Sequence, residues 1–238
     1  IAADAATGGC WGIAFNNITG DPDAVYHRNA EFIGNTIING GNLAFNVTNC
    51  PDCVIENNLI VQNWPYDGSR GMMISSRAAR LAGGDDLNTR NTIRNNTIWF
   101  GPNSSGGGTG IIVGIEGADH IIANNTVSSA ESIGGMSCFD YPLALAAYAF
   151  INNNHCHSAA AYEWVSGSGT LAEWMTYASA QGFDSASIDG VDPQFTAVGT
   201  NFTPLVGSPL INAGNALYGS TQDLTGMTRP ATPAIGAY

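Results

Sequence analysis

A recurring pair of asparagines flanked by apolar residues is the feature that most constrains this 238-residue chain. The segments CVIENNLIVQN, NTIRNNTIWFG, HIIANNTVSSA and AFINNNHCHSA share it, and EFIGNTIINGG carries a weaker copy. The aligned asparagines are Asn35, Asn58, Asn96, Asn125 and Asn154, separated by 23, 38, 29 and 29 residues. Self-similarity at a period of roughly 20 to 50 residues is typical of a repeat architecture in which one supersecondary unit stacks on the next.

The residues around the aligned asparagine indicate the kind of repeat. Ile or Phe stands three positions before it, and Ile, Val or Cys stands two positions after it. Short segments rich in β-branched residues and broken by Asn and Gly predict strands and turns, and no helical periodicity is visible between residues 10 and 160. Asn tolerates the left-handed backbone of a sharp bend, and its amide can bond to the amide stacked above it. The motif therefore predicts an asparagine ladder along a coil of parallel strands.

A further strand is expected upstream of each asparagine, which gives three short strands per coil. These strands are GIAFN, NLAFNV, GMMISS, GIIVGIEG and YPLALAAY, beginning at Gly12, Asn42, Gly71, Gly110 and Tyr141. With this pattern the chain resembles the right-handed parallel β-helix proteins of the pectate-lyase-like superfold. The resemblance implies an all-β fold of about five recognisable coils over residues 1–160. It implies little about function, because one fold hosts many chemistries.

Residues 161–238 have a different character. The segment TLAEWMTYASAQG predicts a helix near 170–182, with Thr170 as its N-cap and Gly182 as its stop. The elements DPQF, GSPLINAG and the final segment ending in IGAY follow it, dense in Gly and Pro. Their order is similar to the carboxy-terminal region of many secreted bacterial β-helix proteins. We expect this region to cap the last coil, because an open coil end exposes unpaired strand edges.

Charge and hydropathy restrict the partners. Seven basic residues, all of them Arg, stand against 19 acidic ones, so the net charge is −12 and a nucleic-acid footprint is absent. The same charge would repel a polyanionic polysaccharide unless cations bridge the two. No segment is long and apolar enough to predict a transmembrane helix. We expect an extracellular or cell-surface protein, and because the chain starts without Met, further coils preceding Ile1 in a longer chain or assembly.

The cysteines and histidines leave several alternatives open. Five cysteines, an odd number, leave open both whether a disulfide forms and which residues pair, and CPDC is too short for a complete zinc site. Cys156 is expected to be a small buried apolar residue in an inward column. His155 and His157 are expected on the surface of a strand without a third metal ligand. His120 is expected at the start of the second strand of its coil, with a role in the turn there and not in catalysis.

The expected site lies on the outer face of the first strand column, where substrate lies in the proteins that this chain resembles. If Ile111 and Val113 point inward, Glu116 points outward, as do Ser75 and Arg77 one coil earlier. The longest insertions are expected to meet there. The candidate catalytic residues are Arg77, Glu116 and Asp140. The candidates for sugar contact are Trp64, Tyr66, Asp67, Ser75 and Tyr141. Asp85 and Asp86 are weak candidates for binding calcium, the one cofactor that these residues suggest.

These residues leave two reactions open, elimination and hydrolysis. Polyuronate elimination needs a base and a cation or Arg beside the carboxylate, and without Lys only arginines are candidates. Hydrolysis needs two carboxylates flanking the scissile bond, about 5 to 9.5 Å apart. Two classes therefore stay open. One is a secreted enzyme that binds or cleaves polysaccharide or cell-surface glycan as a lyase, hydrolase or epimerase. The other is a non-catalytic surface, adhesin or fibre module.

Overall fold

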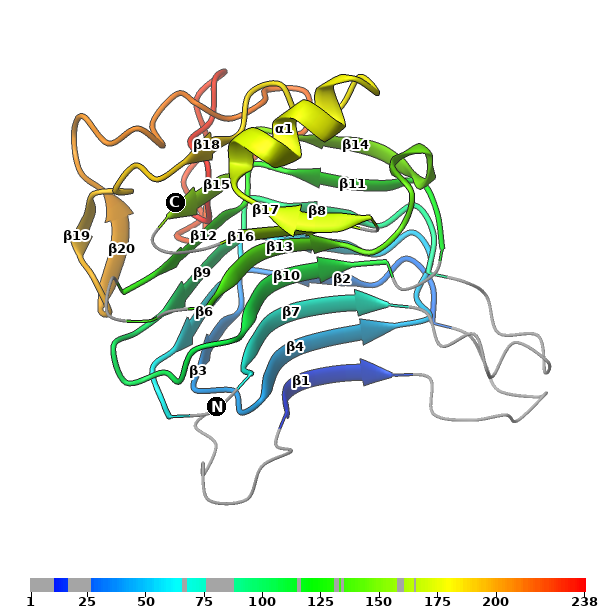
Figure 1. Ribbon diagram of the computed structural model, residues 1–238. Coiled ribbons are helices and arrows are strands. Elements are labelled where there is room, and N and C mark those ends of the chain that lie inside the picture. Colours follow the sequence, from blue (N-terminus) through cyan, green and yellow to red (C-terminus); the bar gives the residue numbers. More distant parts are fainter. Residues whose placement is uncertain are drawn as a thin grey trace.

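The computed structural model describes residues 11–16, 27–65, 68–75, 88–114, 117–130, 133, 135–157, 161–164 and 166–238. In this part the chain is a parallel β-helix whose three sheets run along the coil (Figure 1). Sheet A contains β1 (Trp11–Asn16), β4 (Leu43–Thr48), β7 (Arg70–Ser75), β10 (Thr109–Val113), β13 (Ser137–Tyr141), β16 (Ala161–Trp164) and the antiparallel β17 (Gly167–Gly169). Sheet B contains β2 (Glu31–Ile33), β5 (Val54–Glu56), β8 (Thr92–Arg94), β11 (His120–Ala123) and β14 (Tyr148–Asn152). Sheet C contains β3 (Thr36–Ile38), β6 (Leu59–Gln62), β9 (Thr97–Phe100), β12 (Thr126–Ser129), β15 (His155–His157) and β18 (Ile188–Asp189).

The predicted asparagine ladder is confirmed. The side-chain amide of Asn35 donates to Oδ1 of Asn58 at 2.9 Å, and Asn58 donates to Asn96 at the same distance. Asn96 continues to Asn125 at 2.9 Å and Asn125 to Asn154 at 3.0 Å. A buried amide needs such a partner, because an unpaired one loses its hydrogen bonds to water. The ladder therefore fixes the register of successive coils.

The two asparagines of each pair have separate roles. The first one takes the left-handed backbone at the bend from sheet B to sheet C, with φ of 54°, 51°, 58° and 53° at Asn57, Asn95, Asn124 and Asn153. The second one forms the ladder. The sequence analysis assigned both roles to one residue. The pair is needed because one side chain fills the interior while its neighbour turns the chain.

The interior of the coil is filled by the apolar columns that flank the motif. Ile55, Ile93 and Ile122 line up on sheet B with no exposed surface, and Ile60 and Ile98 do the same on sheet C. The inward register predicted for Ile111 and Val113 is confirmed as well. Toward the carboxy-terminal end the core becomes aromatic, with Phe139, Tyr141, Tyr162 and Trp174 all buried.

The strand predicted in YPLALAAY is wrong. The sheet A strand of this coil is β13, and Leu145–Ala147 form a short 3-10 helix after it. Pro142 explains the shift, because proline has no N–H to donate to a ladder inside a sheet. As a consequence Tyr141 is the last residue of a sheet A strand, where it pairs with Trp164 and its side chain is buried in the core.

The predicted helix is confirmed as α1 (Leu171–Ser179), which lies over the end of the coil (Figure 1). Thr170 caps it, accepting from the backbone of Glu173 while the Glu173 carboxylate accepts from the backbone of Thr170. The indole of Trp174 stacks on Tyr141 with ring centroids 4.6 Å apart. In the part of the chain that the structure describes, no helix has the length and apolar character needed to cross a membrane.

The coil continues beyond residue 160, since β16 extends sheet A and β18 extends sheet C. The rest of the carboxy-terminal region lies along the side of the coil. The hairpin of β19 (Phe195–Ala197) and β20 (Asn201–Pro204) lies beside sheet C at the left of Figure 1. The sheet C residues Leu59, Val61 and Trp99 form a second core with the tail residues Phe195, Phe202, Leu210 and Ile235.

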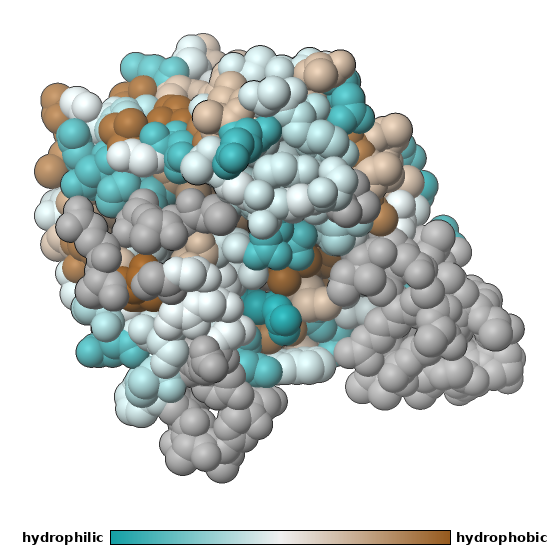
Figure 2. All heavy atoms as spheres, in the orientation of Figure 1, coloured by the Kyte–Doolittle hydropathy of each residue, from teal (hydrophilic) through white to brown (hydrophobic). Residues whose placement is uncertain are grey.

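The tail is also hydrogen-bonded to the left-handed asparagines. Asn153 donates to the Ala213 carbonyl, Asn124 to Asn215, and Asn57 to Gln222, at 2.9, 3.0 and 2.7 Å. Residues 213–222 therefore run along the coil axis toward its amino-terminal end. We call residues 205–238 the strap. Figure 2 shows apolar atoms over the upper left of the molecule, where the hairpin and strap lie, and Val206 there is fully exposed.

Candidate functional site

The outer face of sheet A changes character along the coil. Its central outward column runs through Asn46, Met73, Ile112, Asp140 and Glu163, as the strand register shows. The first three side chains are uncharged, and the last two are carboxylates on the adjacent strands β13 and β16. Neighbouring strands lie about 4.8 Å apart, so two acids directly opposite each other share one local environment.

A groove of about 480 Å³ opens at this pair. Asp140 and Glu163 lie in it, with Pro142 and Trp164 beside them and Gly167 and Ser168 of the β16–β17 hairpin at its border. In this hairpin β17 runs antiparallel to β16, and it forms the edge of sheet A at the last coil. Ser137, the first residue of β13, also lines the groove. Its hydroxyl donates a hydrogen bond to Oε1 of Glu163.

The electrostatics of the groove are set by this carboxylate pair. Burial raises the pKa of Asp140 to about 6, and the nearby Glu163 carboxylate raises it further while Arg70 opposes the shift. Two negative charges on adjacent strands cannot both be accommodated freely, so one carboxyl retains its proton to a higher pH. Asp140 is therefore a proton donor close to neutral pH, beside a second carboxylate that Ser137 holds in place.

This arrangement fits acid-base chemistry. A carboxyl group with a raised pKa next to a carboxylate is the pairing that glycoside hydrolysis uses, one as acid and the other as base or nucleophile. Proton abstraction from a uronate would need a positive group beside the substrate carboxylate. Arg70 pairs with Thr109 two strands away from Asp140, and it is exposed. The groove thus favours hydrolysis over elimination.

The disulfide Cys138–Cys156 braces the strand that carries Asp140. It joins β13 of sheet A to β15 of sheet C through the core, with Cα atoms 5.8 Å apart. Cys156 is buried, as expected, but it is bonded to Cys138 and not a free apolar residue. A cross-link two residues before Asp140 limits the motion of its strand, which keeps the Asp140 carboxyl in position.

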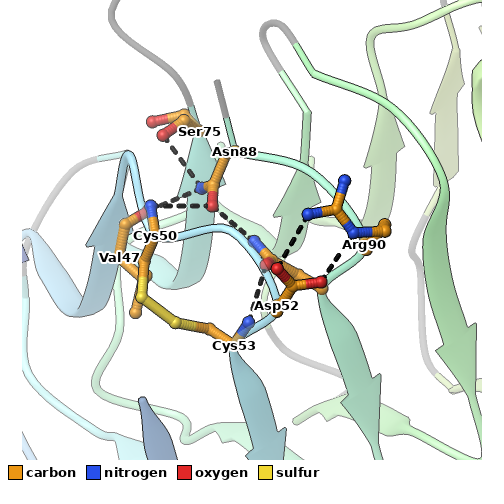
Figure 3. The surroundings of a disulfide bond; sticks show 8 residues. Val47, Cys50, Asp52, Cys53, Ser75, Asn88 and Arg90 are labelled. Atoms are coloured by element: carbon orange, nitrogen blue, oxygen red, sulfur yellow. Dashed lines mark hydrogen bonds and ion pairs between the residues drawn. A yellow bond between two sulfur atoms is a disulfide. The ribbon is translucent and has the colours of Figure 1, made fainter. Parts of the chain in front are cut away.

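The second disulfide, Cys50–Cys53, closes the CPDC turn that leads from sheet A to sheet B (Figure 3). Asn88 of the next coil accepts from the backbone N–H of Cys50 at 3.1 Å, and Arg90 pairs with Asp52 through two bonds of 2.6 and 2.7 Å. Both sulfurs are buried and paired, so this turn has a structural role. Cys10 lies outside the described residues.

The structure tests only some of the predicted site residues. Asp140 lies in the groove. Trp64 is 46% exposed, but it does not line the groove. Six further candidates lie outside the described residues: Arg77, Glu116, Tyr66, Asp67, Asp85 and Asp86.

Two predicted sugar contacts are wrong. The Tyr141 ring is fully buried between Phe139 and Trp174. Tyr141 is the last residue of strand β13, with its side chain toward the core, and it does not belong to a loop. Ser75 is 2% exposed, since the segment at Asn88 packs against the end of β7 and bonds to its carbonyl. Neither side chain is open to a ligand on the outer face.

Glu163 and Ser137 were not among the predicted site residues, because the coil was expected to end at residue 160 and the strand β13 was placed too late. One signal was available: SCFDY and AYEW both place an acid directly before an aromatic residue that ends the strand. Aligning the acids predicts that Asp140 and Glu163 are neighbours.

The histidines are buried more deeply than predicted. His155 is not on the surface: the tail covers it, and its ring bonds to Thr126 Oγ1 at 2.7 Å and to the Val191 carbonyl at 2.8 Å. His120 begins β11, the second strand of its coil, as predicted, and it is equally buried. Burial lowers the pKa of both rings to about 4. Among the described residues, no group of three or more His, Cys, Asp and Glu side chains is placed to hold a metal ion.

Comparison with known proteins adds no assignment. No protein family matches the sequence, and no curated protein matches it either.

Proposed function

We propose that this protein binds and hydrolyses a polysaccharide in the groove on the outer face of sheet A. The observation that carries this proposal is the pairing of Asp140 and Glu163 on adjacent strands inside a groove of about 480 Å³. Asp140, with its pKa raised to about 6, acts as the general acid that protonates the glycosidic oxygen. Glu163 acts as the carboxylate that activates water or attacks the sugar.

The substrate class follows from the charges of the site. Asp140 and Glu163 would repel the carboxylates of a polyuronate, and the net charge of −12 acts in the same direction at longer range. A neutral polysaccharide avoids this repulsion. Its hydroxyls can bond to the carboxylates and to Ser168, while Pro142 offers apolar surface to the sugar ring.

The proposed setting is extracellular, in line with the resemblance to secreted β-helix proteins of the pectate-lyase-like superfold. Two disulfides, Cys50–Cys53 and Cys138–Cys156, support it, because disulfides persist mainly in oxidising compartments.

A second candidate function is a non-catalytic surface, adhesin or fibre module. The observation that favours it is the uncharged outward column of the earlier coils, Asn46, Met73 and Ile112, which carries no acid-base group. A module of this kind would use the groove to hold glycan without cleaving it.

Product analysis on a panel of polysaccharides tests the proposal. The protein is incubated with neutral, amino-sugar and polyuronate polymers, and new reducing ends and unsaturated products are measured separately. We expect new reducing ends from a neutral polymer, and their complete loss in Asp140→Asn and Glu163→Gln. Glu31→Gln, an exposed acid on sheet B, serves as the matched control and retains activity. Unsaturated products would replace hydrolysis by elimination.

Binding measured on the same panel separates the two candidates. Saturable binding of a polymer by the parent protein without any cleavage would favour the non-catalytic module. No binding and no cleavage across the panel would overturn both. If cleavage occurs, the anomer released first, read by NMR, shows whether Glu163 acts as nucleophile or through a water molecule.

A further inference from the structure

The outer face of sheet C contains a break in its apolar packing. One outward column runs through Ile38, Val61, Trp99, Ser128 and His157, as the strand register shows. Val61 and Trp99 pack into the second core beneath the hairpin and strap. The column then changes to a serine and a histidine, although the hairpin still lies over this part of the sheet.

A cavity of about 190 Å³ fills the space at this break. It lies between sheet C, which contributes Trp99, Ser128 and His157, and the tail, which contributes Asp192, Phe195 and Val198. The tail thus bridges over the cavity, since Phe195 packs on one side of it with the second core.

An unsatisfied hydroxyl lies at the cavity. Ser128 is 2% exposed, and its Oγ has no hydrogen-bond partner. The neighbouring outward residue of the same strand is different, because Thr126 Oγ1 bonds to the ring of His155. Native proteins pair nearly all buried hydroxyls, so an unpaired one lining a cavity indicates a group that is absent from the protein itself.

We propose that this cavity is a binding site for a small neutral polyol, such as a single sugar unit. Ser128, His157 and Asp192 provide hydrogen-bonding groups, and the rings of Trp99 and Phe195 provide apolar surface for the C–H face of the ligand. The carboxylate of Asp192 disfavours an anion. The volume lies below the roughly 300 to 1,000 Å³ of pockets for larger ligands, so an oligosaccharide does not fit.

This site is separate from the groove of the proposed function. The groove is lined by residues of β13, β16 and β17, whereas the cavity is lined by sheet C and the tail. The proposal therefore does not depend on hydrolysis, and a protein without any glycosidase activity would still carry the site.

Ligand titration of the parent protein and of Ser128 variants tests the proposal. The probes are glycerol, methyl glucoside and, as the anionic counterpart, glucuronate, with saturation-transfer NMR and tryptophan fluorescence as readouts. We expect saturable binding of methyl glucoside or glycerol and weaker binding of glucuronate. Ser128→Val continues the apolar column into the cavity and should weaken polyol binding about tenfold or more. Ser128→Ala removes the hydroxyl alone and keeps the test usable if valine does not fit.

The control variant is Ser166→Val, an exposed serine outside the cavity, which should bind the polyol as the parent does. No saturable signal with either neutral probe overturns the proposal, and so does equal polyol binding by the parent and both Ser128 variants. Equal affinity for glucuronate overturns the assignment to neutral ligands. A thermal midpoint that rises in Ser128→Val while the parent binds no polyol would identify the cavity as a packing defect.

Discussion

The outer faces of sheets A and C differ in what lies against them. Both carry a column of outward side chains at every turn, but sheet C is covered by the hairpin and strap while the groove on sheet A stays open. The outward column of sheet C has Val61 and Trp99 where that of sheet A has Met73 and Ile112. One face binds the tail of its own chain, and the other carries the groove in which we propose that a polysaccharide binds.

The strap stabilises the coil over a long distance in the sequence. Ser220 bonds to Asn57 across 163 residues, and Ala237 bonds to Thr97 across 140. Such contacts link several coils that otherwise touch only their neighbours. These bonds therefore add contacts between coils on the sheet C side of the molecule.

The largest effect is expected from breaking the core that both faces share. Ile122→Asn places an amide between Ile93 and Ile151 in a column without exposed surface. The lost apolar contact costs about 2–5 kcal/mol and the buried amide about 1–3 kcal/mol more, a large part of the stability of a typical domain. Calorimetry should show an unfolded or strongly destabilised protein.

Ile33→Asn is the matched control, because Ile33 lies on the same sheet with 46% of its surface exposed. Its thermal midpoint should stay close to that of the parent. If Ile122→Asn behaves like this control, the inward register of sheet B is wrong.

A smaller effect is expected from loosening the cover of sheet C. Arg229 bonds to Asn57 Oδ1 at 3.0 Å and to the carbonyls of Gly236 and Tyr238 at 2.8 and 3.0 Å. Burial lowers the pKa of its guanidinium to about 10, and the group remains charged at neutral pH. Arg229→Ala removes these charge-assisted bonds and should cost about 2–4 kcal/mol.

Hydrogen exchange measures this loss by region. The strap and the outer side of sheet C should exchange faster in Arg229→Ala, while β13 and β16 keep their protection. Arg90→Ala, which removes an exposed ion pair with Asp52, should leave both regions unchanged. Equal loss of protection on sheets A and C would mean that the strap supports the whole coil and not one face.

Two substitutions at Asn57 distinguish the contribution of the left-handed bend from that of the strap bonds. Its backbone has a φ of 54°, and its side chain bonds to Ser220, Gln222 and Arg229. Asn57→Gly keeps the left-handed backbone and loses the strap bonds, so it should cost about 1–2 kcal/mol. Asn57→Ala loses both and should cost about 1 kcal/mol more. Chemical denaturation of the two variants gives the difference, and equal midpoints would assign no strain to the bend.

How far the sequence predicts this molecule depends on the range of the interaction. The ladder and the inward columns were predicted because each repeats locally at every coil, as with Ile93 and Asn96. The cover of sheet C was not, because it joins residues such as Asn57 and Gln222 that are 165 positions apart and share no motif. Among the residues that line the groove, Asp140 is the one that the sequence predicted as a candidate, since its neighbour Glu163 is identified only once the strand register of the last two coils is known.

The smallest effect is expected in the groove on sheet A, where the titration of Asp140 makes the stability of the protein depend on pH. The folded protein raises the pKa of Asp140 from 3.8 to about 6, so the protonated form is favoured in the native state. Its contribution to stability is complete below about pH 3.8 and is lost as the pH rises toward 6. Asp140→Asn removes this loss, so the variant should gain about 1 kcal/mol over the parent between these limits, once solvent screening of a half-buried group is allowed for. Asp184, buried at the coil end with its pKa also raised to about 6, titrates in the same window but is present in both proteins and cancels. Denaturation midpoints measured at several pH values test this difference. A gain that is already present at pH 4 and does not grow toward pH 6 would mean that the carboxyl is not held apart from solvent by the groove, and its assignment as the proton donor would fail with it.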